Sequence, residues 1–100
     1  MVTERPGVKT APVILDRPRG EPRTAPRYKV LLHNDDVNDM ARVVQALQKV
    51  FRFPAGEAVR VMLEAHERGV AVCRVEPLEP AELHRDQLRS AGLGASIEAA

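Results

Sequence analysis

Five of the six residues at positions 34–39 carry short polar side chains. They are Asn34, Asp35, Asp36, Asn38 and Asp39. Side chains of this kind accept hydrogen bonds from nearby backbone N–H groups, form turns and cap a following helix. One helix cap needs only one acceptor. The stretch therefore offers more acceptors than a strand-to-helix turn requires, which makes it the first candidate for a binding site.

A metal site is one possible use of these acceptors. Asp35 and Asp36 supply carboxylates, and His66 is the histidine that could join them. Two adjacent acids and one distant histidine form a weak pattern for a metal centre. His66 is also expected in the last turn of a helix, where the helix dipole favours a cation. Helix capping is therefore the first interpretation of His66, and we predict no bound metal.

The remaining reactive side chains give no catalytic pattern. Cys73 is the single cysteine and lies in an apolar, β-branched run, so we expect a buried and unreactive thiol. His33 and His84 have no partner that the sequence makes visible. The chain has no glycine-rich phosphate loop and no base beside a hydroxyl group. We predict no enzymatic activity and no cofactor.

Length and composition exclude several classes of protein. One hundred residues make one domain, and a net charge of +1 gives no concentrated basic face for a nucleic acid. No apolar run approaches the roughly 18 residues that cross a membrane, and the first residues do not resemble a secretory signal. We expect a soluble protein of the cytoplasm. Two phenylalanines, one tyrosine and no tryptophan predict an aliphatic core.

Proline divides the chain into two parts. Five of the eight prolines lie at positions 6, 12, 18, 22 and 26. Repeated proline removes backbone donors and prevents helix formation, so residues 1–26 are expected to be a disordered extension. Residues 27–100 are expected to form the folded domain.

The first half of this domain reads as a strand and two helices. Tyr28–His33 is an apolar run suited to a strand, and apolar residues at helical spacing begin at Met40. Pro54 ends that pattern and is suited to the first position of a second helix. The second helix should run to about Arg68, with Gly69 as its C-cap. Its apolar stripe should consist of Ala58, Val61, Met62 and Ala65.

The second half reads as a strand, a helix and a strand. Val70–Val75 is a β-branched run that predicts a central strand, and residues 77–80 predict a loop. Residues 80–90 predict a short third helix, and Leu93–Ile97 a last strand. The order β-α-α-β-α-β predicts an α+β sandwich with a three-stranded antiparallel sheet and helices on one side.

The chain resembles the ClpS family, whose members are adaptors that deliver N-degron substrates to the Clp protease. The resemblance runs from Tyr28 to about Val75 and is thinner from Glu76 onward. The matching segments are Val30–Asp36, Met40, Val43-Val44, Leu47–Lys49, Met62-Leu63, His66, Gly69 and Ala71–Cys73. Leu93 and the ending Ile97–Ala100 are similar to that family's last strand.

The resemblance implies roles for nine residues. Asn34 and Asp35, joined by His66, would accept hydrogen bonds from the α-ammonium group of a substrate. The adjoining apolar pocket would take its first side chain and would be formed by Met40, Val43, Met62, Ala65 and Leu93, with Asn38 at the rim. An ammonium group has three donors and needs several acceptors, including a carboxylate. An apolar pocket favours Leu, Phe, Tyr or Trp.

The resemblance also implies partners. They are N-degron proteins and the N-terminal domain of a Clp-type AAA+ unfoldase. The adaptor itself would be a monomer, and it would bind neither nucleic acid nor a membrane. The compartment would be the cytoplasm, or the plastid stroma in a photosynthetic eukaryote. Three features depart from the family's pattern. Val37, Asn38 and Asp39 replace an aromatic residue, Thr and Pro; Ala65 replaces a branched aliphatic residue; and residues 76–92 form a shorter third-helix region.

One alternative to an adaptor is a stalk-type ribosomal domain, because a similar small α+β fold occurs at the C-terminus of the ribosomal stalk protein. Such a domain would need a strongly basic, glycine-rich region around its second helix. Only Arg60 and Arg68 supply positive charge in that part of this chain. An enzyme is the other alternative and would need a metal or a nucleophile.

Overall fold

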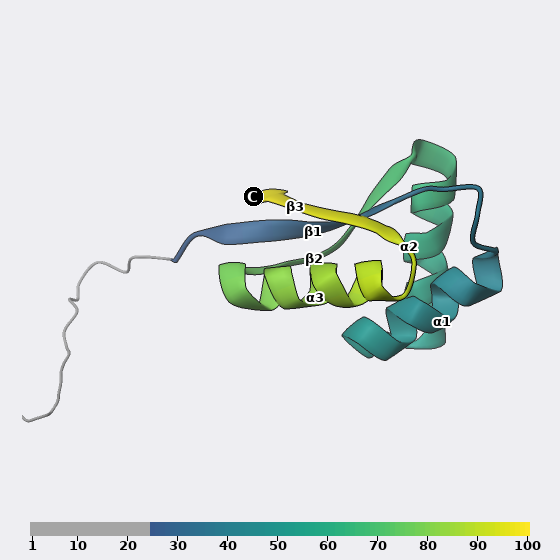
Figure 1. Cartoon of the computed structure of the whole chain (residues 1–100), viewed down its shortest axis with the longest axis horizontal. Coiled ribbons are helices and arrows are strands. Elements are labelled where there is room, and N and C mark those ends of the chain that lie inside the picture. The colour runs from purple at the N-terminus through teal and green to yellow at the C-terminus, as the bar shows by residue number, and fades with distance from the viewer. Residues whose placement is uncertain (1–24) are drawn as a thin grey trace, which may run out of the picture.

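A computed structural model describes residues 25–100 (Figure 1). Its elements are β1 (Arg27–His33), α1 (Met40–Phe51), α2 (Ala55–Arg68), β2 (Val70–Pro77), α3 (Leu78–Ser90) and β3 (Gly94–Ala99). This is the predicted β-α-α-β-α-β order, and the predicted α+β class is confirmed. The extension predicted for residues 1–26 lies outside the described residues, apart from positions 25 and 26.

The three strands form one antiparallel sheet in the order β2-β1-β3. β1 is the middle strand, so the prediction that residues 70–75 form the central strand is wrong. Three consecutive residues of β1, Val30 to Leu32, are buried, in keeping with a strand that has a neighbour on each edge. In β2, burial alternates and Val72 is 38% exposed. Its β-branched residues suit a half-exposed edge strand equally well.

α2 and α3 pack on the sheet, α1 packs on α2 and α3, and all of them share one aliphatic core (Figure 1). Leu47 of α1, Val61 of α2 and Leu88 of α3 are all completely buried. The stripe predicted for α2 is confirmed, because its buried residues are Ala58, Val61, Met62 and Ala65. The core thus contains residues from the sheet and from all three helices.

Local sequence signals predicted both ends of α2 to within one residue. Gly69 has a φ of 88° and its N–H donates to the Ala65 carbonyl at 2.8 Å, which confirms the predicted C-cap. Pro54 is the N-cap residue, so α2 begins at Ala55, one position after the predicted first helical residue. With a φ of −60° and a ψ of 159°, its backbone is extended and leads into the helix without belonging to it.

No loop separates β2 from α3, in contrast to the prediction for residues 77–80. β2 runs to Pro77 and α3 begins at Leu78. Pro77 is the N-cap, and Pro80 lies in the first turn, where backbone N–H groups have no partner within the helix. Both prolines therefore fit a helix start. The last strand begins at Gly94, one residue after the predicted start, and reaches Ala99.

His33 and His84, for which the sequence shows no partner, each have a hydrogen-bond partner in the structure. The Nδ1 atom of His84 lies 2.6 Å from Oε2 of the buried Glu76, and Nε2 of His33 lies 2.7 Å from the Ser96 hydroxyl. These partners come from other elements, so sequence spacing gave no sign of them. Within the described residues, no helix combines the length and the apolar character needed to cross a membrane.

The core predicts a clear contrast between two leucines. Leu47→Ala should lower the free energy of unfolding by about 2–5 kcal/mol, because it empties a fully enclosed site. Leu83→Ala is the control, since Leu83 is 54% exposed, and should change it by less than about 0.5 kcal/mol. Urea unfolding measures both values. Equal losses in the two variants would contradict the assignment of the core.

Candidate functional site

The polar turn of residues 34–39 joins β1 to α1 and is fixed at its start to the end of α2. The Asn34 N–H donates to the Gly69 carbonyl at 3.0 Å. His66 lies in the last turn of α2, as the sequence predicted. The hydrogen bond to Gly69 therefore brings the first residues of the turn beside the end of the helix that carries His66.

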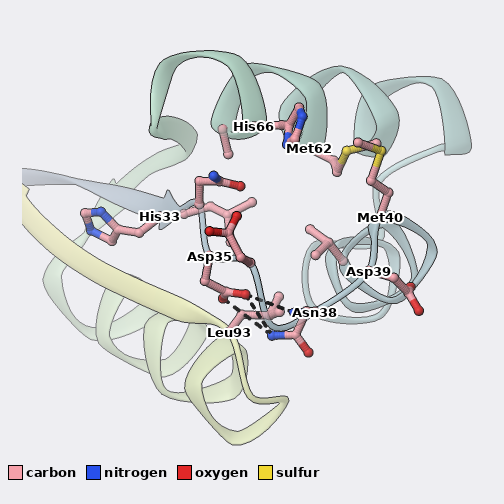
Figure 2. Close-up of a pocket in the computed structure, with 13 residues that line it drawn as sticks. His33, Asp35, Asn38, Asp39, Met40, Met62, His66 and Leu93 are labelled. Carbon is pink, nitrogen blue, oxygen red and sulfur yellow. Dashed lines mark hydrogen bonds between the residues drawn. The ribbon is translucent and has the colours of Figure 1, made fainter.

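The Asp35 carboxylate shapes the turn itself. Its Oδ1 atom accepts hydrogen bonds from the backbone N–H groups of Val37 and Asn38, both at 3.0 Å. The pKa of Asp35 is lowered mainly by the Asn38 backbone bond, against a smaller opposing effect of burial and with help from Val37 and the Asn38 side chain. Figure 2 shows this carboxylate turned toward Asn38. Asp35 is therefore held as an anion by the turn that it forms.

Two more polar residues of the turn have hydrogen-bond partners. Asp39 is the N-cap of α1 and accepts a hydrogen bond from the Arg42 N–H at 2.8 Å. The Asn38 amide donates to the Gly92 carbonyl at 2.9 Å. Within residues 25–100, no hydrogen bond reaches the side chains of Asn34 and Asp36. These two are the acceptors left over by turn formation and capping.

A pocket of about 310 Å³ opens beside this turn (Figure 2). It is lined by Leu32, His33, Asn34, Asp35, Asp36, Asn38, Asp39, Met40, Val43, Met62, Ala65, His66 and Leu93. All nine residues singled out in the sequence are among them. They come from the turn, α1, α2 and the residue before β3, so the fold brings together segments up to 59 positions apart, from Asn34 to Leu93.

One part of the pocket is polar and the other is apolar. Asn34, the two adjacent aspartates and His66 supply acceptors. Met62, Ala65 and Leu93 form a buried apolar surface. Met40 is 46% exposed and lines the pocket from α1. Figure 2 shows the Met40 and Met62 side chains reaching toward each other from α1 and α2.

Four lining residues were missed as pocket residues: Leu32, His33, Asp36 and Asp39. In Figure 2, His33 and Asp39 point away from the cavity, consistent with their bonds to Ser96 and to the start of α1. Asp36 was considered only as a metal ligand. Its position next to Asp35 in the crowded turn was the signal that could have identified it.

The metal alternative finds no support in residues 25–100, where no three side chains of His, Cys, Asp or Glu are grouped to hold an ion. The pocket instead combines hydrogen-bond acceptors with an apolar surface. Such a small α+β domain is a binding module for a ligand that has a cationic or donor group next to an apolar group.

Comparison with known proteins identifies the family. Residues 23–96 match the family described as "ATP-dependent Clp protease adaptor protein ClpS". The chain belongs to this family, which decides against the stalk-type ribosomal alternative.

Several relatives support this assignment. The ClpS adapter of Prochlorococcus marinus (strain MIT 9515) is 47% identical over 74% of this chain and 71% of its own length. The ClpS adapter of Synechococcus elongatus is 48% identical over 76% of this chain and 81% of its own length. The chloroplastic CLPS1 adapter of Arabidopsis thaliana is 44% identical over 80% of this chain and 51% of its own length.

A solved structure agrees with the fold. The structure of Agrobacterium tumefaciens ClpS2 bound to L-phenylalaninamide has a TM-score of 0.72 to this chain and is 32% identical in sequence. The match covers 77% of this chain and 100% of the Agrobacterium tumefaciens chain. The ligand of that relative has a free α-amino group beside an aromatic side chain.

The buried thiol gives a testable prediction about reactivity. Burial raises the pKa of Cys73 to about 12, with a smaller opposing effect of Arg74. The thiol should stay protonated up to about pH 10, and alkylation requires the thiolate. Iodoacetamide at pH 8 should therefore label Cys73 only after urea unfolding, as measured by mass spectrometry. Rapid labelling of the folded protein would show that Cys73 is accessible.

Proposed function

We propose that this chain is an adaptor that binds proteins with Leu, Phe, Tyr or Trp at the N-terminus and delivers them to the Clp protease. The observation that carries the proposal is a pocket in which unpaired acceptors adjoin a buried apolar surface. A free N-terminus followed by a large apolar side chain presents the complementary pair of groups. Membership of the ClpS family and the phenylalaninamide bound by its relative support this assignment.

The polar end of the pocket would bind the α-ammonium group. Asn34 offers a carbonyl oxygen, and a neutral His66 offers a ring nitrogen. Asp35 offers Oδ2, because its Oδ1 already accepts two backbone hydrogen bonds. We add Asp36 to this group, since it lines the same pocket and its carboxylate has no hydrogen bond within residues 25–100. Two carboxylates beside one ammonium group also attract the cation over a longer range.

The apolar end would enclose the first side chain. Met62, Ala65 and Leu93 are already buried in the free protein, so their surface is formed before a ligand arrives. Met40 and Val43 line the side formed by α1, and the flexible, half-exposed Met40 can adapt to side chains of different shape. Asn38 lies at the rim. A preformed apolar surface of this kind rewards burial of a large side chain.

The partner would be the N-terminal domain of a Clp-type AAA+ unfoldase, and the adaptor would act as a monomer without a reaction of its own. The named relatives occur in bacteria and in a chloroplast, so the site of action would be the cytoplasm or the plastid stroma. Residues 27–100 would form the binding domain, and residues 1–26 an extension.

The ammonium site predicts dependence on a free N-terminus and on charge. A fluorescent peptide beginning with Phe should bind, and the same peptide with an acetylated N-terminus should not, because acetylation removes the charge and two donors. Asp36→Asn should weaken binding by about 1.5–3 kcal/mol, the range for a hydrogen bond to a charged group. Fluorescence anisotropy measures these affinities.

Substitutions of Asp35 separate charge from turn formation. Asp35→Asn keeps an oxygen that can accept the Val37 and Asn38 N–H groups, whereas Asp35→Ala loses it. Asp35→Ala should therefore weaken binding more than Asp35→Asn. Acetylated peptide bound as tightly as free peptide would refute the ammonium site, and an unchanged affinity of Asp36→Asn would remove Asp36 from it.

Ala65 predicts a preference among first residues. A branched aliphatic residue at this buried position would narrow the pocket, so Ala65 leaves a wider space that suits Phe better than Leu. Ala65→Val should strengthen binding of a Leu-headed peptide relative to a Phe-headed one by about 1–3 kcal/mol, the value of one or two methyl-sized contacts. Anisotropy with Leu- and Phe-headed peptides measures the ratio. Equal shifts for both peptides would show that Ala65 does not set the preference.

A further inference from the structure

The position of Leu93 in the pocket follows from the way α3 ends. The Leu93 N–H donates to the Leu88 carbonyl at 3.1 Å, and the Gly92 N–H donates to the Arg89 carbonyl at 2.9 Å. Gly92 has a φ of 88°. These features form a Schellman motif, in which the residue after the left-handed glycine packs back toward the last turn of the helix. Leu93 is that residue, and it is buried.

Two side chains from outside α3 hold this short segment in place. Arg42 donates from Nη2 to the Ala91 carbonyl at 3.0 Å, and Asn38 donates to the Gly92 carbonyl at 2.9 Å. The guanidinium group also lies against Gly92, because a Cβ atom built there would be 3.6 Å from Nη2. The carbonyls of the two residues before Leu93 are thus held by side chains of the polar turn and of α1.

Arg42 is the better test of this connection, because it does not line the pocket. Its backbone N–H is bound by Asp39, the N-cap of α1, at 2.8 Å. Its side chain extends from the first turn of α1 to the end of α3. The residue therefore joins the helix that carries Met40 and Val43 to the segment that carries Leu93.

We infer that Arg42 is a positioning residue for the apolar part of the pocket, which acts on the first side chain of the ligand through Leu93. This inference rests on the proposed function. Arg42 holds the Ala91 carbonyl and so fixes the distance between α1 and Leu93, on either side of the space for that side chain. A loosened segment would let Leu93 move away and reduce its contact with the ligand.

A purely structural role for Arg42 predicts something different. In that case its removal would lower stability, and any effect on binding would be the same whether or not residue 93 has a large side chain. An effect through Leu93 disappears once the Leu93 side chain is truncated, because two residues that act through one contact are not additive. A double-mutant cycle therefore separates the two roles.

The experiment measures the affinity of the full chain for a Phe-headed peptide by fluorescence anisotropy. Arg42→Met removes the donors but keeps an apolar stem, and it should weaken binding roughly two- to tenfold, the range of one net hydrogen bond. Arg42→Lys keeps a donor and should restore part of the affinity. Arg52→Met is the matched control, because Arg52 lies at the far end of α1 and outside the pocket, and it should bind like the wild type.

The cycle is completed by Leu93→Ala alone and combined with Arg42→Met. The inference requires that Arg42→Met has little further effect when residue 93 is alanine, with urea unfolding showing that all variants are folded. An unchanged affinity of Arg42→Met, or the same loss in both backgrounds, would overturn it. A folded wild type without affinity for the Phe-headed peptide would overturn the proposed function, and the inference with it. Wild-type binding separates these two failures.

Discussion

The pocket depends on the antiparallel pairing of β1 with both of its neighbours. His33, the last residue of β1, is paired with Val70 on one side and with Gly94 on the other. The end of β1 therefore lies between the start of β2, which directly follows α2, and the start of β3, which directly follows Leu93. This register brings the polar turn, the last turns of α2 and Leu93 to one place. A different strand order would separate them.

Within this frame, the polar turn divides its side chains between structure and binding. Asp35, Asn38 and Asp39 satisfy backbone groups of the turn, of α1 and of the segment after α3. These bonds fix the backbone of the turn that carries Asn34 and Asp36, two residues that line the pocket. A turn with fewer polar residues could form the same connection, but it would leave no acceptors for a ligand.

The far end of α1 is fixed by a second group of contacts. Phe51 stacks on Phe53 with ring centroids 5.0 Å apart, and the Arg74 guanidinium lies over both rings. Arg74 also donates to the Phe51 carbonyl at 3.0 Å, and the His84 ring lies 4.9 Å from the Phe51 ring. Since Arg74 belongs to β2 and His84 to α3, α1 is attached to the rest of the domain at its C-terminal end as well as beside the pocket.

The sequence alone determined the features that depend on neighbouring residues. The start of α1 after a polar cap, the end of α2 at Gly69 and the buried face of α2 follow from hydrogen bonds and periodicity within a few positions. The resemblance to a family supplied the nine pocket residues. Their convergence on one cavity agrees with it, whereas their separate roles in binding stay predictions.

Only the tertiary structure decided which strand is central, which partners His33 and His84 have, and what Arg42 contacts. Val70–Val75 satisfies the requirements of an edge strand as well as those of a central one, so composition could not choose between them. The bonds from His33 to Ser96 and from Arg42 to Ala91 span 63 and 49 positions. Such contacts exist because the whole sheet and its helices pack together, and no local pattern encodes them.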